Sequence, residues 1–182
     1  MIITNDEKFL RLPCELVKTE DISQLIEILD KELDYSNKLG TSGIGLAATQ
    51  IGVQQKAAIV RIGKLKINLI NCEIANMYDK TVFTDEGCLS FPSITHDTYR
   101  YQEIHVINNA IEPYNFIATG LAAVVVQHEI GHFNSDLFMD HKVPKPITIN
   151  KRIKIGPNEK CPCGQIDLIT KKTKKYKKCC GK

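Results

Sequence analysis

One stretch of sequence constrains this chain more than any other. His128 and His132 stand four positions apart, with Glu129 between them. On a helix of 3.6 residues per turn, positions four apart share a face, so both imidazoles can reach one metal ion. Residues 121–126 are all apolar, which predicts a buried helix. Two imidazoles and a carboxylate are costly there unless they are paired or ligated, so the pattern favours a metal site over two surface histidines.

A catalytic zinc-type site needs a third protein ligand and one open position. The longer metallopeptidase pattern would place that ligand at position 138, which is Phe138. A thermolysin-like site would need a glutamate well downstream, and after Asp140 the only acidic residues are Glu159 and Asp167. Both of these peptidase classes are therefore disfavoured.

Two candidates for the third ligand remain. Cys88 lies in the polar, glycine-containing segment Glu86–Ser90 and offers a thiolate. Asp136 follows His132 by one helical turn and stays open as the weaker candidate. The hypothesis is a Cys-His-His metal site that activates water, with Glu129 in contact with that water.

A segment of small residues, 43–50, ends in the amide of Gln50. Its Gly-x-Gly-x-x-Ala spacing could suggest a dinucleotide-binding loop, but such a loop follows a strand and has an acidic residue about 20 positions later. Here the segment follows a predicted helix, and no acidic residue occurs between Asp34 and Glu73. We therefore expect a loop that a substrate approaches closely, with Gln50 as a hydrogen-bond donor.

The three segments Gly43–Gln50, Glu86–Ser90 and Gln127–His132 resemble, in this order, the three signature motifs of peptide deformylases. The resemblance extends from about Phe9 to about Asp140. It implies an enzyme that removes the formyl group from N-formylmethionine on nascent polypeptides and releases formate. The chain departs from the family pattern in having Gly131 for aspartate, Phe133 for leucine and Ser135 for glycine, and none of these is a direct metal ligand.

The resemblance also implies roles for individual residues. Cys88, His128 and His132 would hold the metal, and Glu129 would act as general base. The side-chain amide of Gln50 and the backbone N–H of Leu89 would stabilise the oxyanion. The family typically uses Fe²⁺, and Zn²⁺ can replace it; a thiolate and two imidazoles suit either ion.

The methionine side chain of such a substrate needs an apolar pocket beside the metal. Val124 and Val125 precede His128 and Glu129 by one turn on the same helical face. Together with Ile44 they are the predicted pocket residues, and Gly45 is predicted to pair with an extended substrate backbone.

The remaining pattern predicts an α+β fold with antiparallel strands around the central HExxH helix. An amphipathic helix is expected over residues 21–39, with a capping box of Asp21 and Gln24 and a stop at Gly40. Strand-rich runs are expected within residues 56–71, 74–83 and 103–108. The metal-binding helix is expected to be capped by Thr119 and to end near Asn134.

Charge divides the chain sharply. Residues 1–140 carry a net charge of −8 and residues 141–182 one of +11, and the break falls near the prolines at 144 and 146. This predicts a catalytic domain over residues 1–142, a linker over 143–155 and a basic tail over 156–182.

The tail contains Cys161, Cys163, Cys179 and Cys180 in two pairs. Four cysteines in a segment too short to bury a core predict a structural Cys₄ zinc site. The segment also resembles the small zinc-binding tail of the Sec translocation ATPase, with a longer spacing between the pairs. The charge of +11 over residues 141–182 attracts polyanions, so ribosomal RNA or protein is the expected partner, against the alternative of a solvated tail with no specific target.

The cysteine spacing indicates metal ligands rather than disulfides, and residues 1–8 have no signal-peptide pattern. No run of 18 apolar residues occurs, so a cytoplasmic protein with no membrane span is expected. Cys14 and Cys72 are expected to be reduced core thiols. Two alternatives stay open: another HExxH metal hydrolase, and a non-catalytic ribosome-associated protein that retains the deformylase fold.

Overall fold

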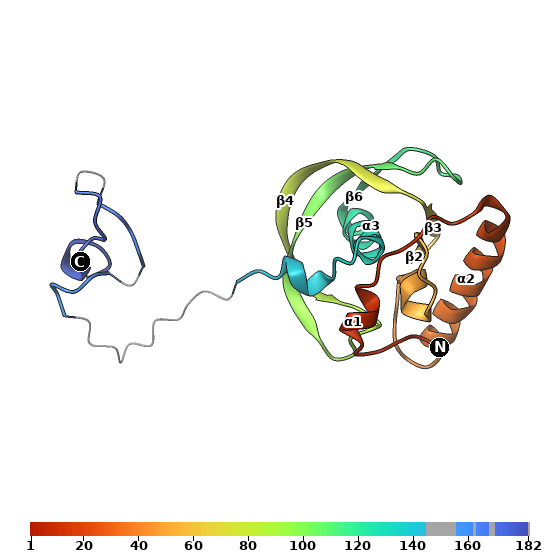
Figure 1. Ribbon diagram of the computed structural model, residues 1–182, viewed down its shortest axis with the longest axis horizontal. Coiled ribbons are helices and arrows are strands. Elements are labelled where there is room, and N and C mark those ends of the chain that lie inside the picture. The colour runs from red at the N-terminus through yellow and green to blue at the C-terminus, as the bar shows by residue number, and fades with distance from the viewer. Residues whose placement is uncertain (145–155, 162, 168–169, 182) are drawn as a thin grey trace. The chain divides into compact units, whose positions relative to one another are not determined.

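The computed structural model describes residues 1–144, 156–161, 163–167 and 170–181. The chain divides into two units, Met1–Val143 and Pro144–Lys182 (Figure 1). All but the first two residues of the predicted linker, 143–155, lie outside the described residues. None of the helices in the described part combines the length and apolar character needed to cross a lipid bilayer.

Two antiparallel three-stranded sheets form the first unit, which confirms the predicted antiparallel strands. The first sheet has the order β1-β2-β3 and the second β4-β5-β6. The strands are β1 (Gly45–Ala47), β2 (Ala57–Ile62), β3 (Leu65–Ile70), β4 (Glu73–Gly87), β5 (Thr95–Ile107) and β6 (Phe116–Thr119). The α-helices are α1 (Glu7–Leu10), α2 (Ile22–Lys38) and α3 (Gly120–Phe133), with 3₁₀ turns at Thr19–Asp21, Ala48–Ile51 and Phe138–His141.

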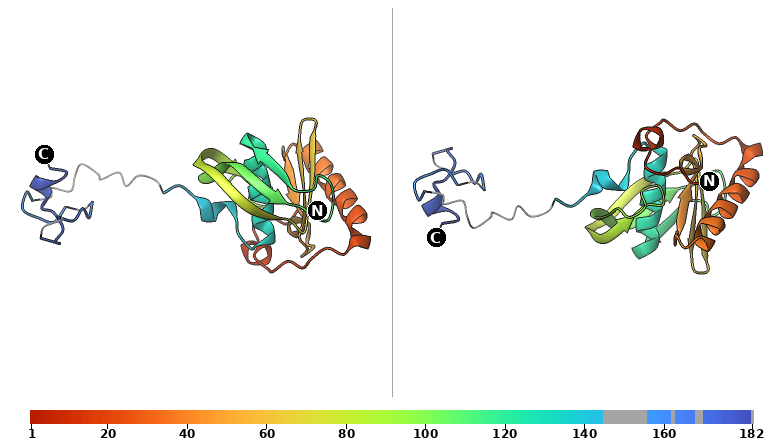
Figure 2. Two further views of the ribbon diagram at one scale, coloured as in Figure 1. Left: turned by 90° about the horizontal axis from the view of Figure 1, so that it is seen from above. Right: turned by 90° about the horizontal axis from the view of Figure 1, so that it is seen from below.

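Strand β2 shows how the first sheet is enclosed. Successive strand residues point to opposite faces, so Ala57 and Ile59 join the cluster under α2, whereas Ala58 and Val60 join the cluster around α3. All four are fully buried because a helix covers each face. Helix α3 contacts strands of both sheets, and Figures 1 and 2 show it enclosed by the curved β4–β5 hairpin.

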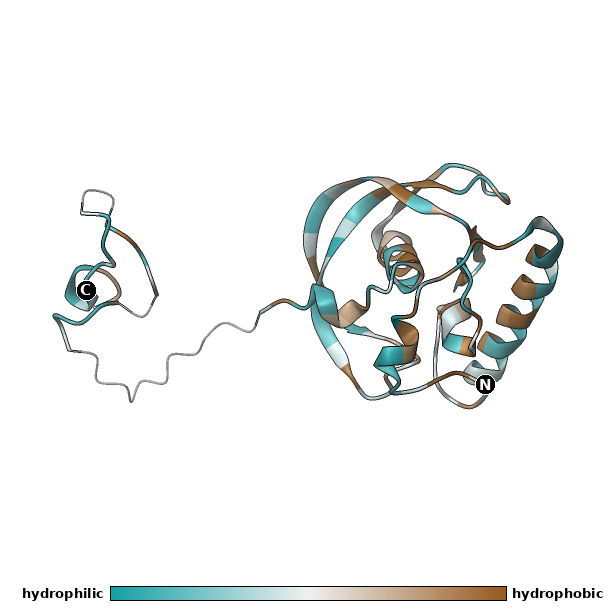
Figure 3. Ribbon diagram, in the orientation of Figure 1, coloured by the Kyte–Doolittle hydropathy of each residue, from teal (hydrophilic) through white to brown (hydrophobic). Residues whose placement is uncertain are grey.

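Helix α2 follows its sequence pattern closely. Ile22, Leu25, Leu29 and Leu33 form its buried stripe, and hydrophobic and hydrophilic residues alternate along it in Figure 3. The predicted stop is confirmed, because Gly40 adopts the left-handed φ of +90° just beyond the last turn. The predicted capping box is wrong: Asp21 has a helical backbone after a 3₁₀ turn, and its side chain makes no capping hydrogen bond.

Two further expectations need correction. Residues 43–50 do not form a plain loop, because Gly45–Ala47 pair with Val60–Ala58 as strand β1 and the next four residues form a 3₁₀ turn. Thr119 stands at the N-cap position of α3 with an extended backbone, but its side chain makes no capping hydrogen bond.

The β4–β5 hairpin is much longer than the short strand runs predicted for this region. Its register shifts by one extra β4 residue between Phe83 and Glu86, where Asp85 takes a φ of +55°. Such a bulge bends the strand and re-aims its side chains. It lies directly before Glu86 and Cys88, at the end of β4.

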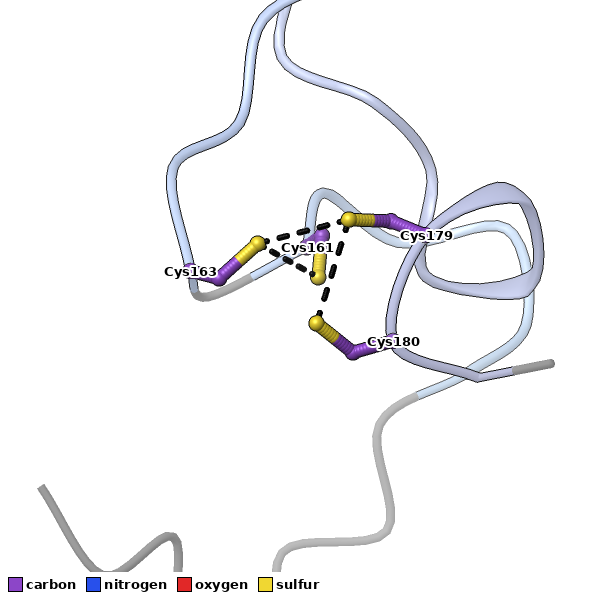
Figure 4. A group of neighbouring side chains, drawn as sticks. All are labelled: Cys161, Cys163, Cys179 and Cys180. Atoms are coloured by element: carbon purple, nitrogen blue, oxygen red, sulfur yellow. Dashed lines mark hydrogen bonds between the residues drawn. The ribbon is translucent and has the colours of Figure 1, made fainter.

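The second unit is built from hairpin-like pairings and one 3₁₀ turn. Lys160 bridges to Lys175 and Ile166 to Thr173, both antiparallel, and a 3₁₀ turn spans Tyr176–Lys178. The backbone N–H groups of Cys179 and Gly181 both donate to the Tyr176 carbonyl. The two bridges and the turn together bring the two cysteine pairs close to each other (Figure 4).

Leu29 offers a direct test of the packing between α2 and the first sheet. Leu29→Ala should lower the free energy of unfolding by about 2–5 kcal/mol, because truncating a fully buried leucine removes apolar packing and leaves a cavity. Urea denaturation would measure this. The matched variant Ile28→Ala, at a position 39% exposed on the same helix, should cost at most about 1 kcal/mol. Equal losses for the two variants would contradict the packing described here.

Candidate metal centre

Three potential ligands meet where α3 passes the end of β4. His128 and His132 come from successive turns of α3, and Cys88 directly follows β4. Their ligand atoms all lie within 4.8 Å of one another, and the Cys88 Sγ is 3.6 Å from the His132 Nε2. One metal ion therefore fits between them without a change of fold.

A buried carboxylate orients one of these histidines. The His128 Nδ1 donates to Glu86 Oε1 at 2.6 Å, which leaves Nε2 free for a metal. Arg100 holds Glu86 in turn through a bidentate pair at 2.8 and 2.6 Å, and the Thr98 hydroxyl donates to the same carboxylate. Both Glu86 and Arg100 are almost fully buried.

The charges in this network are strongly coupled. Burial opposes ionisation of Glu86, but the hydrogen bonds from His128 and Arg100 outweigh it and lower its pKa to about 2. Burial likewise opposes the charged form of His128, but hydrogen bonds to Cys88 and Glu86 raise its pKa to about 10.

The other two polar groups on this face of α3 have unmet hydrogen-bonding capacity. Glu129 Oε2 and His132 Nδ1 are buried and have no partner among the described residues. Burial raises the pKa of Glu129 to about 7 and lowers that of His132 to about 4. A neutral His132 beside a thiol is ready to bind a metal, and a cation there would compensate the buried Glu129 carboxylate. The donor set therefore fits a metal ion.

Gln50 faces the same site from the 3₁₀ turn after β1. Its Oε1 accepts the Ala47 N–H at 2.8 Å, which fixes the side-chain amide. The Nε2 group is thereby directed at Cys88 Sγ, at 3.4 Å, and at Ser90 Oγ, at 3.2 Å. Within the described residues the backbone N–H of Leu89 has no acceptor, so two donors are available on this side of the site.

The glycines of the small-residue segment permit close approach. A Cβ atom on Gly43 would lie 2.6 Å from Leu89 Cδ1, and one on Gly45 would collide with the carboxylate of Glu129. The groups that approach this backbone closely are side chains of the protein, and close approach of a substrate stays a prediction. The side chains of Leu89 and Glu129 occupy the space that larger residues would need.

A hollow of about 510 Å³ opens over these groups. Its lining includes every predicted substrate-binding residue, namely Ile44, Gly45, Val124 and Val125, together with Gln50, Cys88, Leu89, His128 and Glu129. His132 lies beneath, at 2% exposure.

Asp136, the weaker candidate for the third ligand, lies apart from the metal-binding atoms. Its Oδ2 is 2.6 Å from His141 Nε2. The remaining cysteines of the first unit also lie elsewhere, and burial raises the pKa of the Cys72 thiol to about 12. Cys14 is only partly buried, so the description of both as core thiols holds for Cys72 alone.

Sequence reasoning missed the supporting residues of the site. Arg100 and Thr98 lie two residues apart on one face of β5, and both are buried although polar. Phe138 stacks at 30° on the rings of both His128 and His96. The signal available for Arg100 was an alternating strand pattern that places an arginine on the buried face. The sequence gave no signal for the stacking role of Phe138.

The chain is similar to known proteins in both sequence and structure. The model of the polypeptide deformylase family matches residues 1–146. This chain belongs to the peptide deformylase family. It is 36% identical over 141 residues to peptide deformylase 1 of Bacillus subtilis, covering 75% of this chain and 86% of that protein.

Solved structures of deformylases superpose on this one. The crystal structure of the Thermotoga maritima enzyme superposes with a TM-score of 0.69 at 31% identity, covering 79% of this chain and 97% of that one. The Synechococcus elongatus deformylase in complex with actinonin gives a TM-score of 0.70 at 27% identity, over 80% and 79% of the two chains.

The departures of this chain from the deformylase pattern have local physical consequences. A Cβ at Gly131 would lie 2.8 Å from the Asp136 carbonyl oxygen, so the turn after α3 closes tightly against this glycine. Ser135 within that turn adopts a φ of +60°, which glycine tolerates far better than serine. Arg11 donates to the Ser135 carbonyl at 2.9 Å and forms a bidentate pair with Asp140. These bonds from the N-terminal part of the chain stabilise the turn.

Ser135→Gly should therefore raise stability by up to about 1 kcal/mol, because glycine enters the left-handed region without a Cβ penalty. Gly131→Ala should have the opposite effect, since its new methyl group meets backbone. Thermal unfolding of the two variants would check the signs. A Ser135→Gly protein that unfolds at a clearly lower temperature than wild type would refute this account of the turn.

Arg100→Met should lower the free energy of unfolding by about 3–5 kcal/mol, because Glu86 would be left buried without its main partner. It should also weaken metal binding about 10- to 100-fold, since the orientation of His128 is lost. Urea denaturation and competition with a chelator would measure the two effects. Arg61→Met, which breaks a more exposed pair with Asp30, serves as the control and should leave metal affinity unchanged.

Proposed function

We propose that this chain is a metal-dependent hydrolase that removes the formyl group from N-formylmethionine at the start of nascent polypeptides and releases formate. One observation carries the proposal. In a chain of the deformylase family, Cys88, His128 and His132 converge beside Glu129 and Gln50, and all of these except the buried His132 line a single hollow. The same constellation disfavours a peptidase that uses Asp136, which pairs with His141 instead.

Cys88, His128 and His132 would hold the ion. When bound there, it would lower the pKa of a water molecule and polarise the formyl carbonyl. Fe²⁺ or Zn²⁺ suits this donor set. Glu86 and Arg100 keep the His128 ring turned so that Nε2 faces the Cys88 thiol.

Glu129 would accept the proton of the attacking water and return it to the leaving amine of methionine. Its carboxylate has one oxygen without a partner among the described residues, so it can take that proton without breaking a bond. The Gln50 Nε2 group and the Leu89 backbone N–H would donate to the developing oxyanion. The bond from Ala47 to Gln50 Oε1 keeps the donor end of that amide toward the site.

The methionine side chain would lie against Val124, Val125 and Ile44 in the hollow. The substrate backbone would pair with the Gly45 segment as an added strand. Among the described strands β1 pairs with β2 alone, so its outer side can pair with a substrate at Gly45, while the Ala47 N–H is already taken by Gln50.

Replacing Glu129 tests the proton transfer. Glu129→Gln should bind metal and fold as wild type does, but turnover of a formyl-methionyl peptide should fall by about 10²–10⁴-fold, because general-base catalysis is lost while the ligands remain. Formate release from iron- or zinc-loaded protein would be measured beside the metal content. Activity within about tenfold of wild type would remove Glu129 from this role.

Cys88→Ala is the companion variant. It should lose metal from this site, whereas Glu129→Gln should keep it. Retention of metal at wild-type affinity would point to a ligand other than Cys88. Fully loaded wild-type protein that releases no formate would favour the non-catalytic alternative.

The second half of the proposal concerns the tail. Residues 1–142 would form the catalytic domain, and residues 156–182 a basic module with a structural zinc ion. Four sulfurs around one zinc ion at about 2.3 Å lie about 3.8 Å apart at tetrahedral corners. The sulfurs of Cys161 and Cys163 are 3.3 Å apart, those of Cys163 and Cys179 3.4 Å, and those of Cys179 and Cys180 3.8 Å (Figure 4).

The thiols in this cluster influence one another's ionisation. Hydrogen bonding to Cys161 and Cys163 raises the pKa of Cys180 to about 12, while the backbone N–H of Cys163 helps to lower that of Cys161 to about 6. Four thiolates so close together need a cation to coexist. Four thiolates and one Zn²⁺ together carry a charge of −2, so the site would offset only part of the positive charge of the tail, and the rest would remain available to ribosomal RNA.

Truncation separates the two sites. The full chain should bind close to two metal ions, and a chain ending at residue 145 should bind one and still deformylate small peptides, because every proposed catalytic residue precedes Asp140. Association with ribosomes should weaken on truncation in a salt-dependent way. Loss of small-peptide activity, or ribosome binding unchanged by truncation and salt, would contradict this division of roles.

A further inference from the structure

A second hollow, of about 640 Å³, lies in the first unit on the other side of the Arg100–Glu86 pair from the metal centre. Gln127, Ile130, Gly131 and Asn134 of α3 line one side of it, and residues of β4 and β5 line another. It shares no lining residue with the active-site hollow, and of its lining residues only Arg100, which orients His128 through Glu86, has a part in the proposed catalytic mechanism.

Unpaired positive charge is concentrated around this hollow. Lys56, Lys80 and Lys142 line it, and none of them forms an ion pair within the described residues. By contrast, the active-site hollow has no lysine or arginine in its lining. Lys56 and Lys80 belong to residues 1–140, whose net charge is −8, and Lys142 belongs to residues 141–182, whose net charge is +11.

The carboxylates that line the hollow are mostly engaged. Asp140 is paired with Arg11, and Asp136 is hydrogen-bonded to His141, so Glu73 is the one lining carboxylate with no such partner among the described residues. Arg100 is balanced by Glu86. The lining therefore offers three lysines against Glu73 and Asp136, and this excess of positive charge favours an anion.

The buried arginine adds a further donor. Arg100 is 3% exposed, and its Nε and Nη2 groups are used by Glu86, while Nη1 has no acceptor among the described residues. Of the two hollows, Arg100 lines only this one. An arginine fixed by a bidentate pair, with one amino group left over, is a preorganised donor for a phosphate oxygen.

Aromatic rings accompany the lysines. The Lys80 Nζ lies 4.9 Å from the centroid of the Tyr99 ring and 6.0 Å from that of Tyr101, and Tyr99 is 38% exposed. Exposed rings beside cations form the combination that holds a nucleobase by stacking and its phosphate by charge. The chain also leaves this hollow at Lys142, which bridges to Thr98, and continues into the segment of charge +11. Several separate cations around one hollow favour a polyanion, which brings several phosphates, over a nucleotide with a single phosphate.

We propose that this hollow binds a nucleotide of single-stranded RNA, with the base on Tyr99 and phosphates on Lys80, Lys142 and Arg100. It is an RNA-binding site on the catalytic unit, additional to the one proposed for the tail and independent of the catalytic mechanism. The partner is identified only by this chemistry.

The experiment uses the full chain, loaded with zinc, and a fluorescently labelled single-stranded RNA of mixed sequence at a series of salt concentrations. Lys80→Gln/Lys142→Gln should lower affinity and reduce the salt slope by about 1.4, or about 0.7 for each phosphate that is no longer neutralised. The matched control Lys64→Gln/Lys66→Gln removes the same charge from the β2–β3 hairpin, where neither lysine lines a hollow, and should change the slope much less. All four lysines lie outside the catalytic machinery, so formate release should stay at the wild-type level in both proteins.

Tyr99 separates stacking from charge. Tyr99→Leu should weaken RNA binding by about 5- to 150-fold, and Tyr99→Phe should restore it, because the ring rather than the hydroxyl carries the stacking. Equal losses for the two lysine pairs, or wild-type affinity of Tyr99→Leu, would overturn the proposal. So would binding of AMP without binding of RNA, which would make this a site for a free nucleotide. Loss of RNA binding only on removal of the tail would leave the tail's role standing and overturn the one proposed here.

Discussion

The interaction on which the metal centre depends is the buried pair of Glu86 and Arg100. Glu86 sits just after the β4 bulge, accepts from Thr98 and Arg100 of β5, and holds His128 of α3. Hydrogen bonds to this one carboxylate thereby hold β4, β5 and α3 together. A buried charge of this kind is tolerated because each of its oxygens is hydrogen-bonded, and its loss would leave charges without partners.

Helix α3 packs closely against its neighbours because small residues in the segment beside it leave room for its side chains. Both sheets pack on its apolar side, while Glu129 on its polar side lies against Gly45. Gly45 lets Glu129 lie against β1, and the Ala47 N–H fixes Gln50 from the same segment. Stability and function therefore share residues here: the close packing that buries Glu129 also places it beside the metal ligands.

Two hollows flank the Arg100–Glu86 pair. One contains the metal ligands, the proposed general base and an apolar surface for methionine. The other contains lysines and tyrosines and no metal-binding cluster among the described residues. Their chemistries differ because different segments line them: the β1 segment and the residues after β4 line the first, whereas Tyr99–Tyr101 of β5 and three lysines line the second. A metal-dependent hydrolase with a nucleic-acid-binding surface on its other side would suit a substrate that emerges from a ribonucleoprotein particle.

Local sequence settled the parts of this protein that local physics governs. The apolar stripe predicted α2, the spacing of His128 and His132 set them on one helical face, and the cysteine pairs and charge asymmetry indicated a distinct tail. The three ordered motifs were sufficient to indicate the family. Tertiary structure decided the rest. Short-range patterns could not show that Gly45 joins a strand, that Asp136 turns to His141, or that Arg100 supports His128 through Glu86. Each of these depends on a partner that the local pattern does not specify, and only the folded chain brings that partner within hydrogen-bonding distance.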